Sequence, residues 1–241
     1  MERGGIGHTA RALTMLDAVD ASGRVAGDDV LRSLASSTRG SLLRQAGRHR
    51  DAVRHDGAAL RLAAANVADG AWWRAAFIDA LVGLAADDLG MLRFGASDRL
   101  LSRARAVHAD RPGQWWTDHR PHLRVEWVST ELAIYTGDPS RAVEHAEHGL
   151  RLADRDDVPV RHRVKTLLIA AAAAASSGDE QLARERASAA AAGARAHGLL
   201  PLYWASSSLL SALDPDDPDL SANVARSRSE LIYRGVPFTE P

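Results

Sequence analysis

Apolar residues recur along almost the whole chain at the three- and four-residue spacing of amphipathic α-helices. In one clear example, Ala142, Ala146, Gly149 and Leu150 share one helix face, and most of the residues between them are charged or polar. No stretch combines β-branched residues with the alternation of a strand. The pattern therefore predicts an all-α protein, with helices at about 8–20, 28–46, 49–64, 71–92, 97–109, 121–136, 139–154, 160–177, 179–197, 201–213 and 219–233.

Short turn motifs between these segments return at a nearly constant distance. The motif Ala68-Asp69-Gly70-Ala71-Trp72-Trp73 returns as Ala109-Asp110, an inserted Arg111-Pro112, and Gly113-Gln114-Trp115-Trp116. Trp72 and Trp115 are 43 residues apart, and Gly137-Asp138 returns 41 residues later as Gly178-Asp179. Such a period indicates a repeated supersecondary unit, here a helical hairpin.

The residues of these units resemble a known repeat family. The segment Gly137-Asp138-Pro139-Ser140-Arg141-Ala142 and the helix after it resemble the second half of a tetratricopeptide repeat. Similar elements begin at Gly47-Arg48 and Gly178-Asp179, and a weaker copy has Leu92 where the family prefers glycine. Because the period exceeds the usual 34 residues, the chain is most similar to the long-period repeats of large bacterial transcriptional activators and their stand-alone relatives.

This resemblance implies a right-handed α-solenoid of about five antiparallel helical hairpins. The expected organisation is a single domain over 1–241, with an N-terminal half-repeat at 1–27, repeats at 28–198 and a C-terminal capping hairpin at 199–241.

In tetratricopeptide proteins the inner helices line a concave groove that holds peptides or partner helices. Carried over to this chain, the groove residues are Arg44, Gln45, Asp79, Val82, Arg124, Trp127, Glu131, Tyr135, Lys165 and Leu168. Trp127, Glu131 and Tyr135 share one helix face, although interhelix packing is the alternative for the two aromatic rings. The mixture of aromatic, apolar and oppositely charged residues suits a protein or peptide better than a nucleic acid.

The resemblance thus implies a non-catalytic protein- or peptide-binding scaffold or adaptor. The alternative is a small-ligand or peptide sensor in a regulatory pathway, with its ligand enclosed by the superhelix.

Two tryptophan pairs, Trp72-Trp73 and Trp115-Trp116, stand at or just before the starts of predicted inner helices. Adjacent helical residues point about 100° apart, so both members of a pair cannot face one core. We expect one ring of each pair to pack between hairpins and the other to lie at a rim. Tryptophan is also common at binding hot spots, which leaves core packing and partner contact as the two interpretations.

Composition narrows the functional classes. The net charge of −1 argues against binding nucleic acid by phosphate neutralisation. The absence of cysteine excludes disulfides and thiolate metal sites.

No apolar run approaches the ~18 residues of a membrane helix, and the first residues have no apolar signal region, so a cytoplasmic protein is expected. Among the basic residues only Lys165 is lysine, a bias typical of GC-rich genomes such as those of actinobacteria, and a homodimer is compatible with the sequence.

Candidate chemical motifs are incomplete. Gly5-Ile6-Gly7-His8-Thr9-Ala10 loosely matches a dinucleotide fingerprint, but no strand precedes it, and a flexible N-terminus leading into a helix is the preferred interpretation. His145 and His148, near Glu144, could contribute to a zinc site, but the sequence indicates no third ligand, and solvated residues on an outer helix are the preferred interpretation.

Two further clusters fail in the same way. Asp118, His119 and His122 match no metal template. The acidic loop of Asp214, Asp216, Asp217 and Asp219 lacks the glycine and glutamate of a calcium loop, and a helix N-cap is expected there. Serine-elbow and phosphate-loop motifs are absent, so the sequence predicts no catalytic residue, no metal site and no cofactor.

Overall fold

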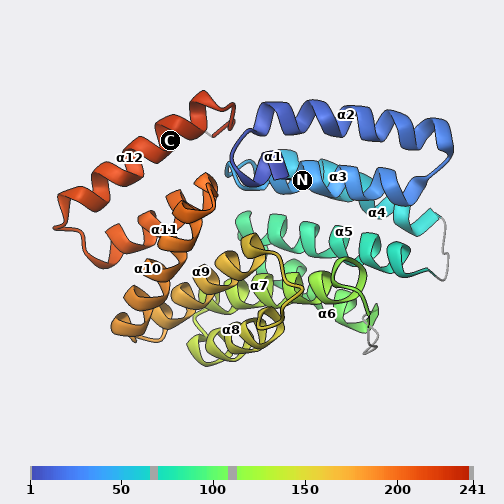
Figure 1. Cartoon of the computed structure of the whole chain (residues 1–241). Helices are drawn as coiled ribbons and strands as arrows, with labels where there is room; N and C mark the ends of the chain where they lie inside the picture. Colours follow the sequence, from blue (N-terminus) through green and yellow to red (C-terminus); the bar gives the residue numbers. More distant parts are fainter. Residues whose placement is uncertain (1, 66–69, 108–112, 239–241) are drawn as a thin grey trace. The chain divides into compact units, whose positions relative to one another are not determined.

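The computed structural model describes residues 2–65, 70–107 and 113–238 (Figure 1). Every regular element in these ranges is helical, which confirms the all-α class. The handedness and hairpin number of the solenoid stay predictions. Of the predicted repeat, Ala68, Asp69 and Ala109 to Pro112 lie outside the described residues, as do 239–241 of the predicted capping hairpin.

The contacts between residues divide the chain into two compact units. The N-terminal unit comprises residues 10–128 with 237–241, and the C-terminal unit comprises residues 129–236 with 1–9. The prediction of one continuous domain stays a prediction.

The N-terminal unit contains most of α2 (Thr9–Ala26), α3 (Asp29–Arg44), α4 (His49–Ala65), α5 (Ala71–Gly90), α6 (Phe94–Val107), the π-helix η1 (Trp115–His119) and the first half of α7 (Arg120–Tyr135). From α3 to α6 each helix packs against the next, and α3 also packs against α5. Contact between alternate helices is what stacked helical hairpins require.

The C-terminal unit contains the second half of α7, α8 (Pro139–Ala153), α9 (Val160–Ser176), α10 (Glu180–Ala196), α11 (Leu200–Leu213), α12 (Pro218–Tyr233) and the short α1 (Glu2–Gly5). From α8 to α12 each helix packs against its successor, and α9 also packs against α11. Within the described ranges, none of the helices has both the length and the hydrophobicity needed to cross a bilayer.

The repeated Gly-Asp turns have a simple structural cause. Gly137 and Gly178 adopt positive φ angles of 73° and 83°, which end one helix at low cost. The next residue, Asp138 or Asp179, caps the following helix by accepting a 3.0 Å hydrogen bond from the amide three residues later. Leu92, at the position where the family prefers glycine, has a φ of 60°.

One predicted break is wrong. The helix predicted at about 8–20 does not end there, because α2 continues through Ser22-Gly23 to Ala26 and Gly27 makes the turn at a φ of 67°. Gly23 instead makes room for a side chain, since a Cβ there would lie 2.7 Å from Cγ of Arg32.

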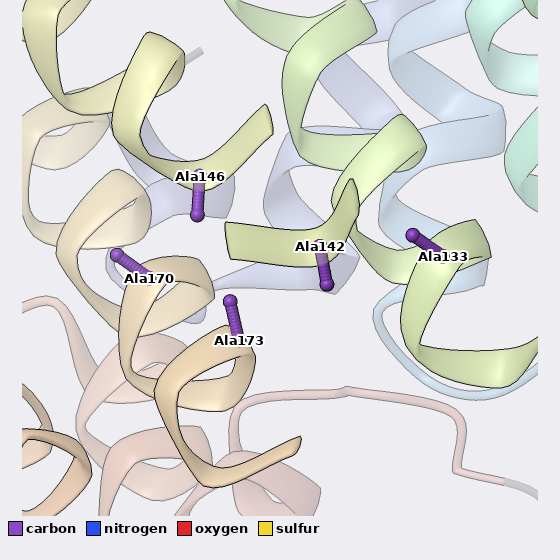
Figure 2. Packing of buried hydrophobic residues seen from close by; sticks show 5 residues of the cluster. All are labelled: Ala133, Ala142, Ala146, Ala170 and Ala173. Atoms are coloured by element: carbon purple, nitrogen blue, oxygen red, sulfur yellow. The ribbon is translucent and has the colours of Figure 1, made fainter. Parts of the chain in front are cut away.

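Alanine dominates the packing of the C-terminal unit. Figure 2 shows the methyl groups of Ala142 and Ala146 from α8 beside those of Ala170 and Ala173 from α9. With Ala133 from α7 they form one buried cluster, in which none is more than 6% exposed. Such small side chains allow neighbouring helices to approach closely.

Candidate functional site

The predicted groove residue Arg44 lies at the centre of a buried ionic cluster in the N-terminal unit. Its Nη1 donates hydrogen bonds to Oδ2 of Asp56 (3.0 Å), to the carbonyl of Gly83 (2.9 Å) and to Oδ1 of Asp87. The side chains of Asp56 and Asp87 are fully buried, and that of Arg44 is 13% exposed. One guanidinium therefore links α3, α4 and α5.

Two glycines make the space that the Asp56 carboxyl group fills. A Cβ at Gly40 of α3 would lie 2.4 Å from Oδ2 of Asp56, and a Cβ at Gly83 of α5 would lie 2.2 Å from Oδ1. Both distances are too short for any real side chain, so α4 can insert this carboxyl group only where both neighbouring helices carry glycine.

In this cluster two carboxyl groups face the one guanidinium of Arg44. The pKa of Asp56 is raised to about 7, mainly by burial. The charge of Asp87 acts in the same direction, and Arg44 opposes both effects. His49, at the start of α4, places Nδ1 3.7 Å from Oδ1 of Asp87. Asp56 and Asp87 thus face the same guanidinium, and the Asp56 carboxyl group titrates near neutral pH.

A second buried ion cluster joins α5 to α7. Asp79 is 3% exposed and accepts hydrogen bonds from Nη2 of Arg120 and Nη1 of Arg124. Burial alone would raise the pKa of Asp79, but the two guanidinium groups hold it below its ordinary value. The predicted groove residues Asp79 and Arg124 are thus paired with each other inside the helix packing.

In each tryptophan pair one ring packs against its neighbours and the other is more exposed, as expected. Trp73 stacks on Phe77 at 5.4 Å between ring centroids and donates a 2.6 Å hydrogen bond to the carbonyl of Ala63. Its neighbour Trp72 is 52% exposed. In η1, Trp115 is 5% exposed whereas Trp116 is 40% exposed.

The remaining predicted groove residues occupy different environments. In the N-terminal unit, Gln45 is exposed, whereas Val82 and Trp127 are buried, which fits the packing alternative for Trp127. In the C-terminal unit, Tyr135 is 61% exposed, and the structure leaves Glu131, Lys165 and Leu168 half-buried.

Sequence reasoning missed Asp56, Asp87 and Arg120. A signal for one of them was present, because Asp79, Gly83 and Asp87 recur every four residues on one face of a segment that is otherwise almost entirely apolar. Charges on an apolar helix need buried partners, and these partners could have been sought among the arginines of neighbouring helices.

Two weak metal candidates have local structural roles. Asp118 accepts hydrogen bonds from the amide of Gln114 (3.1 Å) and the hydroxyl of Thr117 (2.6 Å). Asp217 caps α12 by accepting from the amides of Asp219 and Leu220, which confirms the N-cap expected in the acidic loop. His145 and His148 lie half-buried on α8.

No known protein-family model matches this chain, and no curated protein sequence matches it either. The similarity to tetratricopeptide repeats therefore rests on the residues quoted above.

Proposed function

We propose that this protein is a non-catalytic scaffold or adaptor that binds another protein or a peptide. The observation that carries the proposal is the division of the two tryptophan pairs. Trp73 stacks on Phe77 and Trp115 is buried, whereas Trp72 is 52% exposed. Trp116 packs edge-on against Trp115 and is still 40% exposed, so both outer rings present surface that a partner can cover. Tryptophan is enriched among the residues that dominate binding energy at protein interfaces.

The charged residues also favour a scaffold or adaptor over a small-ligand sensor. A sensor that encloses a small polar ligand would need charged side chains facing that ligand. Arg44 instead pairs with Asp56 and Asp87 within the helix packing. Asp79 and Arg124 pair with each other. The surface exposed to a partner therefore comes from aromatic rings rather than from these charges.

The test is a comparison of two double variants in partner binding. A partner captured on the immobilised wild-type chain is titrated against Trp72→Ala/Trp116→Ala, which should bind about 30-fold or more weakly because two hot-spot rings are lost. The control is Met15→Ala/Val25→Ala, which removes exposed apolar side chains from α2 of the same unit and should change affinity less than about twofold.

Equal affinities of wild type and the tryptophan variant would reject this binding surface. Circular dichroism of each variant must match wild type, so that a loss of binding is not a loss of helix.

A further inference from the structure

The segment Gly4–His8 packs into the C-terminal unit, although the helix that follows it, α2, belongs mostly to the N-terminal unit. Gly4, Gly5 and Gly7 are buried, and Ile6 is half-buried. The sequence interpretation of a flexible N-terminus is therefore wrong. Local sequence contains no sign of this packing, because the residues that contact the segment lie more than 150 positions away.

Ile6 is the apolar anchor of this segment. It packs against a buried cluster from α9, α10 and α11, whose members are Val164, Ala190, Ala194, Leu199 and Leu202. Leu168, which the family resemblance assigned to the groove, also packs against this cluster. The segment thus packs on the same apolar cluster as Leu168, a predicted partner-binding residue.

The backbone of the segment is bound as well. Arg234, which follows α12, donates a 2.7 Å hydrogen bond from Nη1 to the carbonyl of Ile6. Arg234 also pairs with Glu230, which holds the guanidinium in place. A hydrogen bond to a main-chain carbonyl is the kind of contact that binds a peptide without regard to its side chain.

The glycines on either side of Ile6 fit a narrow space. A Cβ at Gly5 would lie 3.1 Å from Cδ of Arg161. A Cβ at Gly7, whose φ is 92°, would lie 3.0 Å from Cδ2 of Leu231. Residues larger than glycine would therefore need the walls formed by α9 and α12 to move.

We propose that the face formed by α9, α11 and the end of α12 is a peptide-binding site, which Gly4–His8 occupies as an intramolecular ligand. The proposal rests on the peptide-binding function proposed above and names its ligand chemistry. The matching partner is a peptide that adopts the same tight turn, in which Gly7 donates to the carbonyl of Gly4, with an aliphatic residue between two glycines whose carbonyl accepts the hydrogen bond from Arg234. Because the segment is tethered, its effective concentration is in the millimolar range and a partner must displace it.

The experiment frees the site in the full chain and supplies the ligand separately. Ile6→Asp removes the anchor, and a fluorescent synthetic peptide of residues 2–10 is titrated against this variant and against wild type. The peptide should bind the variant saturably and about tenfold or more tightly than it binds wild type, whose site is already filled. The same peptide carrying Ile6→Asp should not bind.

A second substitution tests the carbonyl contact. Adding Arg234→Met to the Ile6→Asp chain should weaken peptide binding by about tenfold, the usual effect of losing a charge-assisted hydrogen bond. A matched control is Arg24→Met, which removes an exposed, ion-paired arginine of α2 and should leave peptide affinity unchanged.

Several outcomes would overturn the proposal. Absence of saturable binding to the Ile6→Asp chain would show that the segment only packs as part of the fold. If Ile6→Asp loses helix content, Gly7→Val provides a second way to expel the segment, and loss of folding in both variants would mean that the segment is a structural part of the unit. A wild-type dimer that Ile6→Asp converts to a monomer would show that the segment docks onto a second copy.

These outcomes are distinguishable from failure of the proposed function. The probe is a segment of the chain itself, so its binding does not depend on Trp72, Trp116 or any external partner. Peptide binding without an effect of the tryptophan variant would retain this site and reject the tryptophan surface.

Discussion

The two units pack comparable helices with opposite chemistry. In the N-terminal unit, α3 and α5 carry glycines where α4 inserts the Asp56 carboxyl group, and Arg44 neutralises it. In the C-terminal unit, the corresponding space between α8 and α9 is filled by alanine methyl groups (Figure 2). Both interfaces need small residues. In the N-terminal unit the glycines make space for a carboxyl group, whereas in the C-terminal unit the alanine methyl groups fill the space between the helices.

The two interfaces therefore depend on different properties of their side chains. A buried ion cluster depends on the identity of its members, because a charge left without its partner in the interior costs several kcal/mol. An alanine interface depends on volume, because a well-packed interior has no space for added atoms. Substitutions should therefore have different effects in the two units.

The largest effect is expected for Arg44→Met, which leaves Asp56 and Asp87 without their shared guanidinium. We expect a loss of about 3–5 kcal/mol in the free energy of unfolding, measured by urea denaturation at neutral pH. The control, Arg24→Met, breaks an exposed pair with Asp20 and should cost at most about 0.5 kcal/mol. Similar small losses in both variants would show that the buried cluster contributes no more than a surface pair.

The next effect belongs to the alanine interface. Ala171 of α9 is fully buried, so Ala171→Leu should destabilise the protein by about 1–3 kcal/mol through overpacking. The same substitution at the exposed Ala189 of α10 should stay within about 0.5 kcal/mol. An unshifted urea midpoint for Ala171→Leu would mean that this part of α9 is not tightly packed.

Two glycines close together in space should respond with opposite signs. Gly83→Ala pushes a methyl group against Asp56 and should cost about 1–2 kcal/mol, after allowance for the better helix propensity of alanine. Gly57 lies next to Asp56 in α4. A Cβ added there would lie 3.8 Å from Nη1 of Arg61, which is ordinary van der Waals contact. Gly57→Ala should therefore stabilise the protein by about 0.5–1 kcal/mol. Thermal unfolding of both variants checks the signs, and equal signs would contradict the role assigned to Gly83.

The sequence predicted the all-α class and most turns because these depend on local rules. Helical spacing, the positive φ of Gly137 and the cap at Asp138 are encoded within a few residues. The ion cluster is different, because Arg44 and Asp87 are far apart in sequence and many arginines could have been the partner. Spacing placed Arg44 and Asp79 on inner helices, but it could not tell a side chain that faces a groove from one that faces the next helix.

The same limit explains the N-terminal segment. The glycines in residues 4–7 indicate which conformations the backbone can adopt. They do not indicate which helices the segment will pack against. Ile6, an unremarkable residue in sequence, acquires its role only from the cluster around Val164 and the carbonyl contact with Arg234.

The last expected effect is a change in the pH dependence of stability, caused by Asp56. Its pKa is raised by burial to about 7 in the folded chain, against an ordinary value near 3.8. Asp87 and Arg44 face it from α5 and α3, and the charge of Arg124 on α7 reaches it as well. Between about pH 4 and 7 the folded chain holds a proton that the unfolded chain releases, so this group stabilises the fold most at low pH and loses that contribution as pH rises.

Replacing Asp56 with asparagine should remove this trend. The free energy of unfolding of wild type should fall relative to that of Asp56→Asn by about 1 kcal/mol per pH unit across this window. Asp79, whose pKa is lowered, is present in both chains and cancels in the difference. Asp20→Asn is the control, because the hydrogen bond from Arg24 lowers the pKa of Asp20 and places its effect below pH 4. Parallel curves for wild type and Asp56→Asn between pH 4 and 7 would show that the carboxyl group between the two glycines is ionised throughout, and that the ion cluster resembles the alanine interface in being insensitive to pH.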